Sequence, residues 1–179
     1  MKTIQIGDLY FKPYISEEEI SKRVKELGEV IINEYNNEPP ILVAVLNGSY
    51  VFAADLSRAL NTPAEIYFMK VSSYDGLQST GVITEELPLK IDVKGKDLLI
   101  VEDIIETGNT LYHLQQKFIE EGCKSCKIVS LLVKNDILKG RVKVDYVGFD
   151  IENDFVVGYG MDYNNKGRNL KSIYTIVKA

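Results

Sequence analysis

The sequence predicts an α/β fold with a central, mostly parallel sheet flanked by helices, and three observations support this prediction. Continuous apolar runs at 41–46 (ILVAVL) and 98–101 (LLIV) have the length and composition of strands buried on both faces. Segments with helical spacing of apolar residues lie between such runs, and short turns rich in Gly, Asn and Ser connect them. Strands that alternate with helices are typical of a parallel sheet, because parallel neighbours need a crossover connection.

The first half of the chain starts this alternation with a helix. Ser16 and Glu19 have the spacing of a capping box, so the helix is expected to begin at Ser16. Four apolar residues then repeat along one of its faces: Ile20, Val24, Leu27 and Ile31. Three further elements are expected in this half: a strand at 41–46, a helix at 50–60 and a strand at 64–71.

The second half begins with a segment at 72–82 that is polar, aperiodic and contains Gly, and we expect it to form a mobile loop. Three elements are expected after it: a strand at 98–101, a helix at 111–122 that ends at a Gly, and a strand at 127–133. From residue 144 onward, short β-branched and aromatic runs alternate with Gly, Asn and Asp. The chain is therefore expected to add short strands, or a small hood, late in its sequence.

Length and composition limit the class of protein. The 179 residues suit one domain spanning 1–179, and a hydrophobic content of 45% is enough for one buried core. The net charge of -5 and the pI near 5.0 argue against a general nucleic-acid-binding protein. The N-terminus lacks the apolar stretch of a secretory signal, and the aliphatic runs are too short to span a bilayer. We therefore expect a soluble, cytoplasmic protein.

Cys123 and Cys126 form a C-x-x-C pattern, which is found in zinc sites and in redox pairs. A zinc site of this kind needs four ligands, and the chain has one His and no second Cys pair. The pair also does not stand at the start of a predicted helix, as it does in thioredoxin-like motifs. We therefore expect structural cysteines, which also suit a reducing compartment.

The segment 98–111 (LLIVEDIIETGNTL) combines features that fit one ligand. It lies where a strand leads into a helix, and ligands of open α/β sheets bind beyond the carboxyl ends of the strands. Residues 107–110 offer amides at a helix start, hydroxyls and a Gly, which together suit a phosphate. Glu102 and Asp103 suit a sugar diol or water-coordinated magnesium. Phosphate plus a diol describes a ribose 5-phosphate. The alternative is a strand end with solvated acids and a helix cap.

The same arrangement favours one kind of chemistry over others. With the phosphate and the diol held, the anomeric carbon of the sugar faces outward and is available for substitution. Carboxylates near that carbon stabilise an oxocarbenium-like transition state. Neither the Walker A pattern nor G-x-G-x-x-G occurs in the chain, which disfavours ATP hydrolysis and nicotinamide binding.

The stretch 101–110 (VEDIIETGNT) resembles the 5-phosphoribosyl-1-pyrophosphate (PRPP) motif of the type I phosphoribosyltransferases. Three further stretches, LVAVLNGSYVFAADL, SLLVKND and VGFDIENDFVVGYGMDY, are similar in order and spacing to the hypoxanthine-guanine phosphoribosyltransferases. The resemblance covers most of residues 40–170. It implies a type I phosphoribosyltransferase-like fold, in which helices flank a mostly parallel sheet that carries a small hood and a flexible lid loop.

The resemblance implies roles for residues on the base side of the site. Lys134 would donate to the exocyclic oxygen of a 6-oxopurine, Phe155 would stack on the base, and the backbone of Val156 would pair with the purine edge. Asp162 would lie near the 2-position of the base and help to position a second magnesium ion. Arg168 would contact the departing pyrophosphate, a task that suits a planar cation with several donors. For each residue the alternative is an ordinary core or surface side chain.

Glu106 is the predicted catalytic residue. In the family this position is an Asp, which takes the proton from purine N7 as N9 attacks the anomeric carbon. The side chain here is one methylene longer, so the role requires a shift of the backbone or the ring, or a loss of activity. A second departure is Asn47, where many relatives have Lys, so that pyrophosphate must depend more on magnesium and Arg168.

The remaining contacts implied by the resemblance involve PRPP. Asn47 and Gly48 form a turn that, in the family, contacts pyrophosphate and carries an unusual non-proline cis peptide bond. Ser73 and Tyr74 belong to the lid. The residues expected to bind ligand on this side are Asn47, Gly48, Ser73, Tyr74, Glu102, Asp103, Ile105, Glu106, Thr107, Gly108, Asn109 and Thr110. The residues expected to hold magnesium are Glu102, Asp103 and Asp162.

The predicted function is that of a magnesium-dependent purine salvage transferase. It would convert hypoxanthine, with guanine as a second base, and PRPP into IMP or GMP and pyrophosphate. Two alternatives remain open: a phosphoribosyltransferase that prefers xanthine, and a non-catalytic PRPP-binding regulator, because two site positions depart from the family pattern. The family also implies a homodimer or homotetramer. No nucleic-acid or membrane partner is expected.

Overall fold

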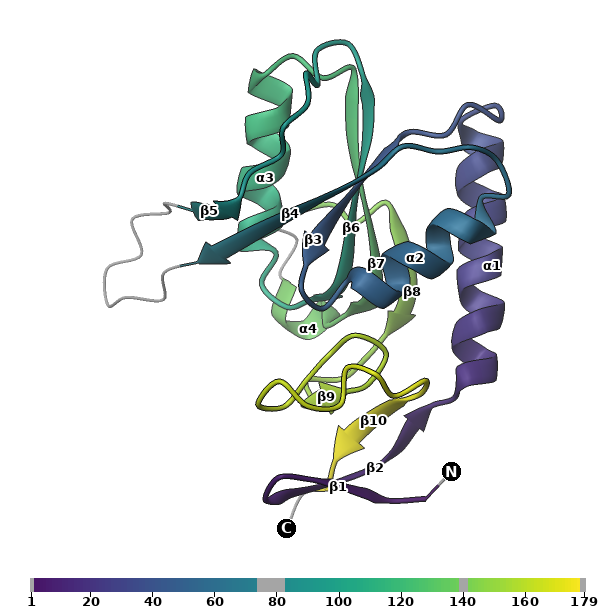
Figure 1. Cartoon of the computed structure of the whole chain (residues 1–179), viewed down its shortest axis with the longest axis vertical. Helices are drawn as coiled ribbons and strands as arrows, with labels where there is room; N and C mark the ends of the chain where they lie inside the picture. Colours follow the sequence, from purple (N-terminus) through teal and green to yellow (C-terminus); the bar gives the residue numbers. More distant parts are fainter. Residues whose placement is uncertain (1, 74–82, 139–141, 178–179) are drawn as a thin grey trace.

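The structure is a computed structural model that describes residues 2–73, 83–138 and 142–177. Its central sheet consists of β3 (Ile41–Leu46), β4 (Ile66–Ser73), β5 (Ile83–Leu87), β6 (Asp97–Ile105), β7 (Ser125–Val133) and β8 (Tyr146–Asp150). The strand order is β5-β4-β3-β6-β7-β8, and all neighbours are parallel except β4 and β5 (Figure 1). The prediction of a mostly parallel sheet is confirmed.

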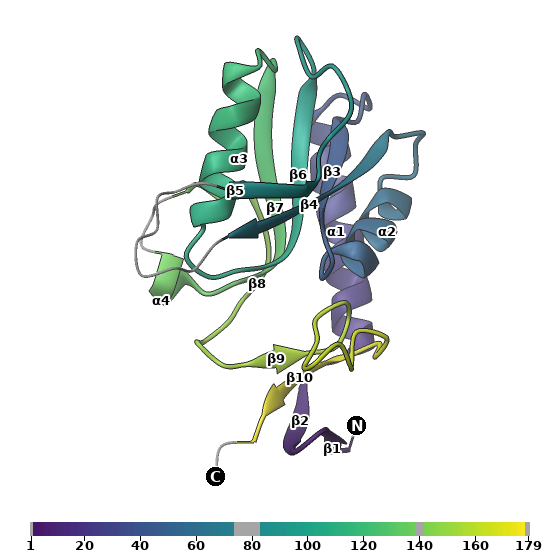
Figure 2. The same cartoon turned by 60° about the vertical axis from the view of Figure 1, so that its left-hand side comes forward.

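Helices cover both faces of this sheet. They are α1 (Glu17–Glu34), α2 (Tyr50–Ala59), α3 (Asn109–Glu120) and the short α4 (Asn135–Leu138). In Figures 1 and 2, α1 and α2 lie on one side of the sheet and α3 lies on the other. Side chains of β3 alternate between two cores: Leu42 and Ala44 pack with α1 and α2, whereas Val43 and Val45 pack with α3. Both faces of the strand are thus buried, as its continuous apolar run indicates.

Helix α1 begins as its sequence predicts. The backbone N–H of Glu19 donates to the Ser16 hydroxyl (3.2 Å), and the Ser16 N–H donates to the Glu19 carboxylate (2.8 Å). This reciprocal pair is the capping box, which satisfies two donors that a helix start leaves without partners. The four residues predicted to form the apolar face of the helix are all buried: Ile20, Val24, Leu27 and Ile31.

A second, antiparallel sheet forms a hood below the central sheet. It consists of β1 (Ile4–Ile6), β2 (Leu9–Ile15), β10 (Ile173–Ile176) and β9 (Val156–Val157), paired in that order (Figures 1 and 2). The short strands predicted late in the chain are present as β9 and β10, and the N-terminal hairpin adds β1 and β2 to the hood, which the sequence analysis did not predict. Phe11 of this hairpin is completely buried and packs with Ile6 and Val157 in a small core of the hood.

Some element boundaries also differ from the prediction. Strand β6 continues past residue 101 to Ile105, so that Glu102 and Asp103 belong to the strand and do not follow it. Strand β4 extends through Ser73, two residues into the predicted loop at 72–82. The rest of that loop, including Tyr74, lies outside the described residues.

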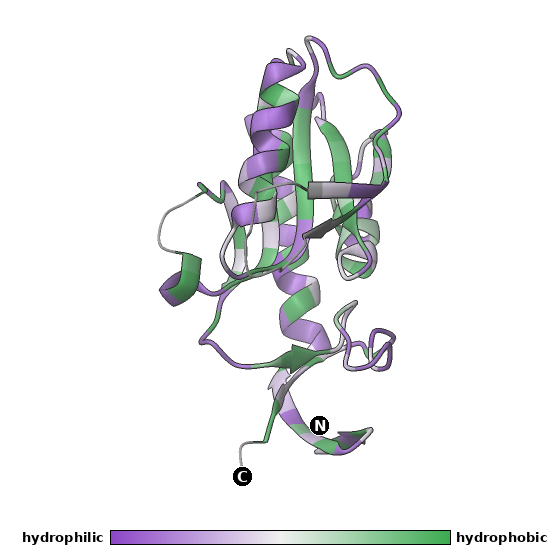
Figure 3. Ribbon diagram, turned by 90° about the vertical axis from the view of Figure 1, so that its left-hand side faces the viewer, coloured by the Kyte–Doolittle hydropathy of each residue, from purple (hydrophilic) through white to green (hydrophobic). Residues whose placement is uncertain are grey.

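Figure 3 shows that the central strands are hydrophobic along most of their length, whereas the helices carry hydrophilic outer stripes. Within the part of the chain that the structure describes, no helix has both the length and the apolar character needed to cross a membrane. Cys123 and Cys126 are free thiols, and burial raises the pKa of Cys126 to about 12. This thiol is therefore protonated at neutral pH.

Helices α1 and α2 cross at Gly28. A Cβ at this position would lie 2.7 Å from the carbonyl carbon and oxygen of Ala59, which belong to rigid backbone. We predict that Gly28→Ala destabilises the protein by about 1–3 kcal/mol, because the helices must separate. The intrinsic helix preference for Ala, about 1 kcal/mol, acts in the opposite direction. Urea unfolding followed by circular dichroism measures the difference.

Val30→Ala is a suitable control, because this side chain lies on the exposed side of the same helix. It should change the free energy of unfolding by no more than about 0.5 kcal/mol. A Gly28→Ala variant as stable as the parent would contradict the predicted close approach.

Candidate active site

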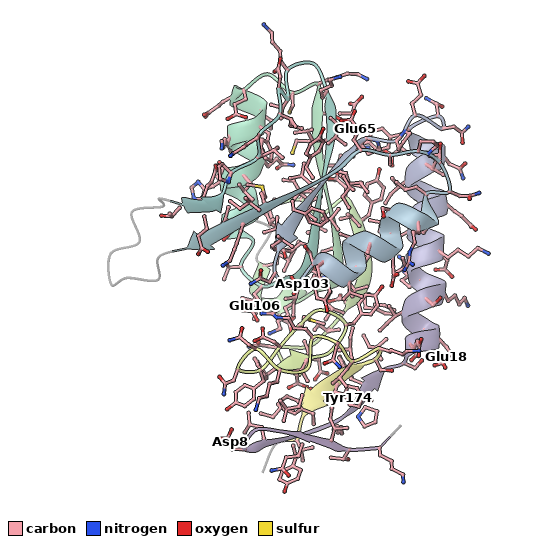
Figure 4. The ribbon with its side chains drawn as sticks, in the orientation of Figure 1. Asp8, Glu18, Glu65, Asp103, Glu106 and Tyr174 are labelled. Atoms are coloured by element: carbon pink, nitrogen blue, oxygen red, sulfur yellow. The ribbon has the colours of Figure 1, made fainter. Side chains whose placement is uncertain are left out.

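Two adjacent cavities lie where the carboxyl ends of the central strands face the hood. The first, of about 340 Å³, is bounded by Val45, Val71, Glu102, Ile104, Ile105, Glu106, Thr107, Gly108, Asn109, Thr110 and Leu111. The second, of about 190 Å³, is bounded by Gly48, Asp103, Ile104, Glu106, Lys134, Phe155, Val156, Met161, Asp162 and Arg168. Glu106 and Ile104 border both cavities. Figure 4 labels Glu106 and Asp103 in this region, between the sheet and the hood.

The end of β6 is positioned by its unequal pairing. Strand β3 pairs with β6 only as far as Val101, whereas β7 continues to pair with it through Ile105. Lys134, the residue that follows β7, donates its backbone N–H to the Ile105 carbonyl (2.9 Å). The extended backbone of residues 102–105 is therefore paired with β7 along one edge, whereas its other edge, toward β3, is open. The open edge is where the two cavities lie.

Three segments approach one another closely around Asp103. A Cβ on Gly48 would overlap the Asp103 carboxylate, and a Cβ on Gly160 would overlap the Gly48 carbonyl oxygen. Gly160 has a φ of 104°, in the left-handed region where Gly is favoured. These two glycines let the turn after β3 fit between the acid of β6 and the hood. Neither contact is visible in a sequence pattern, because the partners are far apart in the chain.

The turn after β3 contains a non-proline cis peptide bond, which joins Leu46 to Asn47. The resemblance implied such a bond at the Asn47-Gly48 turn, and the structure has it one bond earlier. Gly48 borders the second cavity, whereas Asn47 is exposed. The turn thus presents mainly backbone to the cavity.

Glu102 has a strongly shifted pKa, and its neighbour Asp103 is one cause of the shift. Burial raises the pKa of Glu102 well above its usual value, and the negative charge of Asp103 raises it further. The Asp103 N–H donates to the Glu102 carboxylate (3.2 Å), which offsets part of this cost. Two neighbouring carboxylates of this kind suit Mg²⁺, which typically takes one or two protein carboxylates and completes its shell with water and substrate oxygens. The donor set therefore fits the expected ion.

The start of α3 forms the lower wall of the first cavity. Gly108 is the N-cap, with a φ of 73°, and as a glycine it has no side chain to cap the helix, although the Asn109 N–H donates to the Thr107 hydroxyl (3.4 Å). A Cβ at Gly108 would lie 2.5 Å from Val142 and 2.8 Å from Leu138, so that a larger residue does not fit. Residues 107–110 line this cavity, and at a helix start the helix dipole favours an anion.

Lys134 and Glu106 form an ion pair at the boundary of the two cavities. The Lys134 side chain is 5% exposed, whereas the Glu106 side chain is 54% exposed. A buried ammonium needs a charged partner, and Glu106 supplies it from the neighbouring loop. Sequence reasoning assigned these residues to the same ligand but did not predict that they pair with each other.

Asp162 and Arg168 also pair directly, with 2.7 Å between the guanidinium and the carboxylate. Arg168 donates in addition to the Gly160 carbonyl (2.8 Å). The sequence analysis assigned Asp162 to the base and metal and Arg168 to pyrophosphate, and the structure brings the two together. Among the described residues, no three acidic, His or Cys side chains form one metal-binding group. The three predicted magnesium ligands therefore do not form a single cluster.

Phe155 directly precedes β9, Val156 is the first residue of this strand, and both line the second cavity. Phe155 is 44% exposed and Val156 is buried. The structure also adds Ile104 and Met161 to the lining, which the sequence analysis did not name. Both lie inside motifs already noted, next to predicted site residues. The sequence could not identify Ile104 and Met161 as site residues, because apolar residues are also common in cores.

Ser73 lies at the end of β4, and Tyr74 lies outside the described residues. A larger cavity, of about 670 Å³, lies between α1, α2 and the hood segment that contains Arg168. It contains neither the acids of β6 nor the start of α3. The chemistry of the lining, not the volume, therefore selects the two smaller cavities as the candidate site.

The sequence model of the phosphoribosyl transferase domain matches residues 15–164. The chain is 45% identical over 169 residues to the hypoxanthine-guanine phosphoribosyltransferase of Bacillus subtilis (strain 168), covering 94% of each protein. The chain belongs to the hypoxanthine-guanine phosphoribosyltransferase family. It is also 44% identical over 160 residues to the enzyme of that name from Lactococcus lactis, covering 89% of this chain and 87% of the relative.

Solved structures of the family agree with the fold described above. The crystal structure of a hypoxanthine phosphoribosyltransferase from Staphylococcus aureus has a TM-score of 0.88 at 39% identity, covering 93% of this chain and 91% of that chain. The expected type I phosphoribosyltransferase fold is confirmed. The family membership of the chain, inferred from its motifs, is confirmed as well.

The raised pKa of Glu102 leads to a prediction about stability. A folded-state pKa above the reference value of 4.5 means that the folded protein holds this proton more tightly than the unfolded chain. Its contribution to stability is therefore lost as the pH rises through the folded pKa. We predict that Glu102→Gln raises the Tm of the ligand-free protein at pH 8 and has less effect at pH 5. Each kcal/mol recovered corresponds to about 2–4 °C for a chain of this size.

Differential scanning calorimetry at the two pH values measures this effect, with the exposed Glu38→Gln as control. The control should have the same Tm as the parent at both values. A Tm that falls at pH 8 in Glu102→Gln would show that the charged carboxylate stabilises the free protein, contrary to the prediction.

Proposed function

We propose that the protein transfers the phosphoribosyl group of PRPP to N9 of a 6-oxopurine, hypoxanthine or guanine, and releases pyrophosphate. One observation carries this proposal: Glu106 borders both cavities and pairs with Lys134 in the second. The first cavity has the acids and the helix start that suit a phosphorylated sugar. The second has a cation, an exposed aromatic ring and a guanidinium. The carboxylate between them lies where a sugar and a base would be joined.

Binding of PRPP is divided among three groups of the chain. The backbone at Gly108 and the adjacent threonines would hold the 5′-phosphate, because they line the first cavity at the start of α3, where the helix dipole favours an anion. Glu102 and Asp103 would accept hydrogen bonds from the ribose hydroxyls. Arg168 and the turn at Gly48 would contact the pyrophosphate from the second cavity.

Glu102 and Asp103 would also hold Mg²⁺, with Asp162 as a candidate for a second ion. The ion would supply positive charge that stabilises the departing pyrophosphate. The two adjacent carboxylates favour a bound cation. Burial and the charge of Asp103 both disfavour the ionised form of Glu102 and so raise its pKa. A cation at this position would relieve both effects.

Recognition of the base would come from the walls of the second cavity. The Lys134 ammonium would donate to the 6-oxo group, and the exposed ring of Phe155 would stack on the purine. As N9 forms its bond to the anomeric carbon, the bond from that carbon to pyrophosphate breaks, and Glu106 takes the proton from N7. The ion pair with Lys134 would orient the carboxylate for this transfer. The pair with Lys134 would thereby hold the Glu106 side chain, which is one methylene longer than the Asp of the family pattern.

The same site can accommodate a preference for xanthine, because that choice depends on contacts near the 2-position of the base. A non-catalytic PRPP-binding protein would use the first cavity alone. The presence of Lys134, Phe155 and Arg168 together in the second cavity favours the enzyme. We further propose a cytoplasmic, single-domain enzyme that assembles as a homodimer or homotetramer, as the family resemblance implies.

The first test is direct. Purified protein with PRPP and Mg²⁺ should convert hypoxanthine or guanine into IMP or GMP, as followed by chromatography of the products. Conversion of xanthine alone would select the xanthine-preferring alternative. Tight PRPP binding in calorimetry without turnover of any of the three bases would identify a binding protein.

Glu106→Gln tests the proposed base. It removes the proton acceptor but keeps the size of the side chain, so we expect kcat to fall about 10²–10⁴-fold while the KM for PRPP changes little. The control is Glu120→Gln, an exposed carboxylate at the end of α3, which should leave both constants unchanged. Equal loss in kcat and PRPP affinity would argue against a role as base.

Lys134→Met tests recognition of the 6-oxo group. A hydrogen bond from a charged donor contributes about 1.5–3 kcal/mol, so the KM for hypoxanthine should rise about 10–100-fold, with little change in the KM for PRPP. Lys94→Met, at an exposed position, is the matched control. An unchanged KM for hypoxanthine would exclude Lys134 from base recognition.

A further inference from the structure

The base side of the site contains two hood residues that come from different segments. Phe155 directly precedes β9, whereas Asp162 lies in the loop that follows this strand. Phe155 is 44% exposed, so that burial alone does not fix its ring. Whatever orients Phe155 and Asp162 relative to each other determines the shape of the second cavity. Tyr163 is in contact with both.

Tyr163 directly follows Asp162 in the chain, and its ring makes an edge contact with Phe155. The ring centroids are 6.0 Å apart with an interplanar angle of 83°. Phe11, which is completely buried, lies behind both rings, at 6.2 Å from Phe155 and 6.3 Å from Tyr163. The edge of one ring against the face of another is a favoured geometry for aromatic pairs. The three rings therefore limit the orientations that Phe155 can adopt.

The turn between β1 and β2 holds Tyr163 in this position. The Tyr163 hydroxyl donates to the Asp8 carboxylate (2.8 Å), and this bond is the first cause of the raised pKa of Tyr163. A Cβ on Gly7 would lie 3.3 Å from the Tyr163 ring, so the backbone of this turn packs on the ring. Figure 4 labels Asp8 in the outer part of the hood, away from Asp103 and Glu106. The anchor is thus outside the cavity that it supports.

The backbone of Tyr163 also fixes Asp162. Tyr163 and Lys166 exchange two backbone hydrogen bonds (2.9 and 3.0 Å), which close a tight turn. Within this turn, the Asn165 N–H donates to one oxygen of Asp162 (2.7 Å), and the other oxygen pairs with Arg168. A change in the position of Tyr163 would therefore move Phe155 through its ring and Asp162 through the turn.

We propose that Tyr163, anchored by Asp8 of the N-terminal hairpin, is a positioning residue for the purine base. It sets the orientation of Phe155 and of Asp162 without contacting the reacting atoms. The N-terminal hairpin, which carries no residue of the cavity lining given above, thereby takes part in base recognition. This inference depends on the proposed function, because it assigns the second cavity to a purine.

The test separates the binding of the base from the binding of PRPP. Tyr163→Phe removes the hydroxyl and keeps the ring, and Asp8→Ala removes the acceptor from the other side of the same bond. Each variant should raise the KM for hypoxanthine about 3–10-fold and leave the KM for PRPP and kcat within about twofold, as expected for one lost hydrogen bond of typical strength. Because both changes break one interaction, the double variant should resemble the single ones.

Two controls distinguish positioning from a loss of stability. Asp8→Asn keeps a side-chain oxygen that can accept the bond, so it should restore most of the base affinity lost in Asp8→Ala. Tyr10→Phe removes a hydroxyl from an exposed residue of the same hairpin and should resemble the parent. The Tm of every variant should also be measured to identify unstable variants. An unstable variant would contain less active protein, but its KM for the base would not change selectively.

Two outcomes would overturn the inference while leaving the proposed function intact. In the first, the parent is active and the KM for hypoxanthine is unchanged in both Tyr163→Phe and Asp8→Ala. In the second, the KM values for hypoxanthine and PRPP rise equally. A parent that turns over no base would instead overturn the proposed function.

Discussion

The pairing of β6 with β7 is the interaction on which the candidate site depends. These strands remain hydrogen-bonded from Asp97 to Ile105, while β3 leaves β6 at Val101. The last residues of β6 are therefore held rigidly on one side and open on the other. Glu102, Asp103 and Glu106 reach the cavities because of this difference in strand length. A β3 strand as long as β7 would cover the same edge with backbone.

The site combines charges that are costly to bury with partners that reduce this cost. Glu102 has a raised pKa because it is buried beside Asp103. The ionised form of Glu102 is therefore unfavourable in the ligand-free protein, and a bound cation or ligand hydroxyl groups would stabilise it. Lys134 and Arg168 differ from Glu102, because each already has a carboxylate partner. On the base side the substrate would therefore meet cations that already have carboxylate partners, whereas on the sugar side it would meet Glu102, whose charge the Asp103 N–H compensates only in part. This asymmetry agrees with the proposal that a cation binds at Glu102 and Asp103.

The hood couples the two ends of the chain to the same cavity. Strands from the N-terminal hairpin and from the last residues pair in one sheet, and Phe11 packs in the core between them. Gly160 of the hood approaches the turn at Gly48, which in turn approaches Asp103. Contacts of this kind need residues without a Cβ, since Gly160 lies against the Gly48 carbonyl oxygen and Gly48 lies against the Asp103 carboxylate. The position of the hood over the sheet is thus fixed by close packing as well as by the hydrogen bonds of its own strands.

The sequence by itself determined the α/β class, the parallel sheet, the capped first helix and the acidic segment after the apolar run at 98–101. These features depend on local patterns, namely the apolar period and the capping box, which act over a few residues. Motif resemblance added the family and a set of candidate site residues. The acid and glycine pattern of 101–110 was informative because these residues form one continuous segment that borders the candidate cavities.

Only the tertiary structure decided the rest. It placed the N-terminal hairpin in the hood, paired Lys134 with Glu106 and Asp162 with Arg168, and brought Tyr163 between Asp8 and Phe155. It also placed the cis bond at Leu46–Asn47. Most of these features join residues that are distant in the sequence, and their side chains have several possible partners of the same type. The choice among those partners is made by the packing of the sheet and the hood, which no local pattern contains.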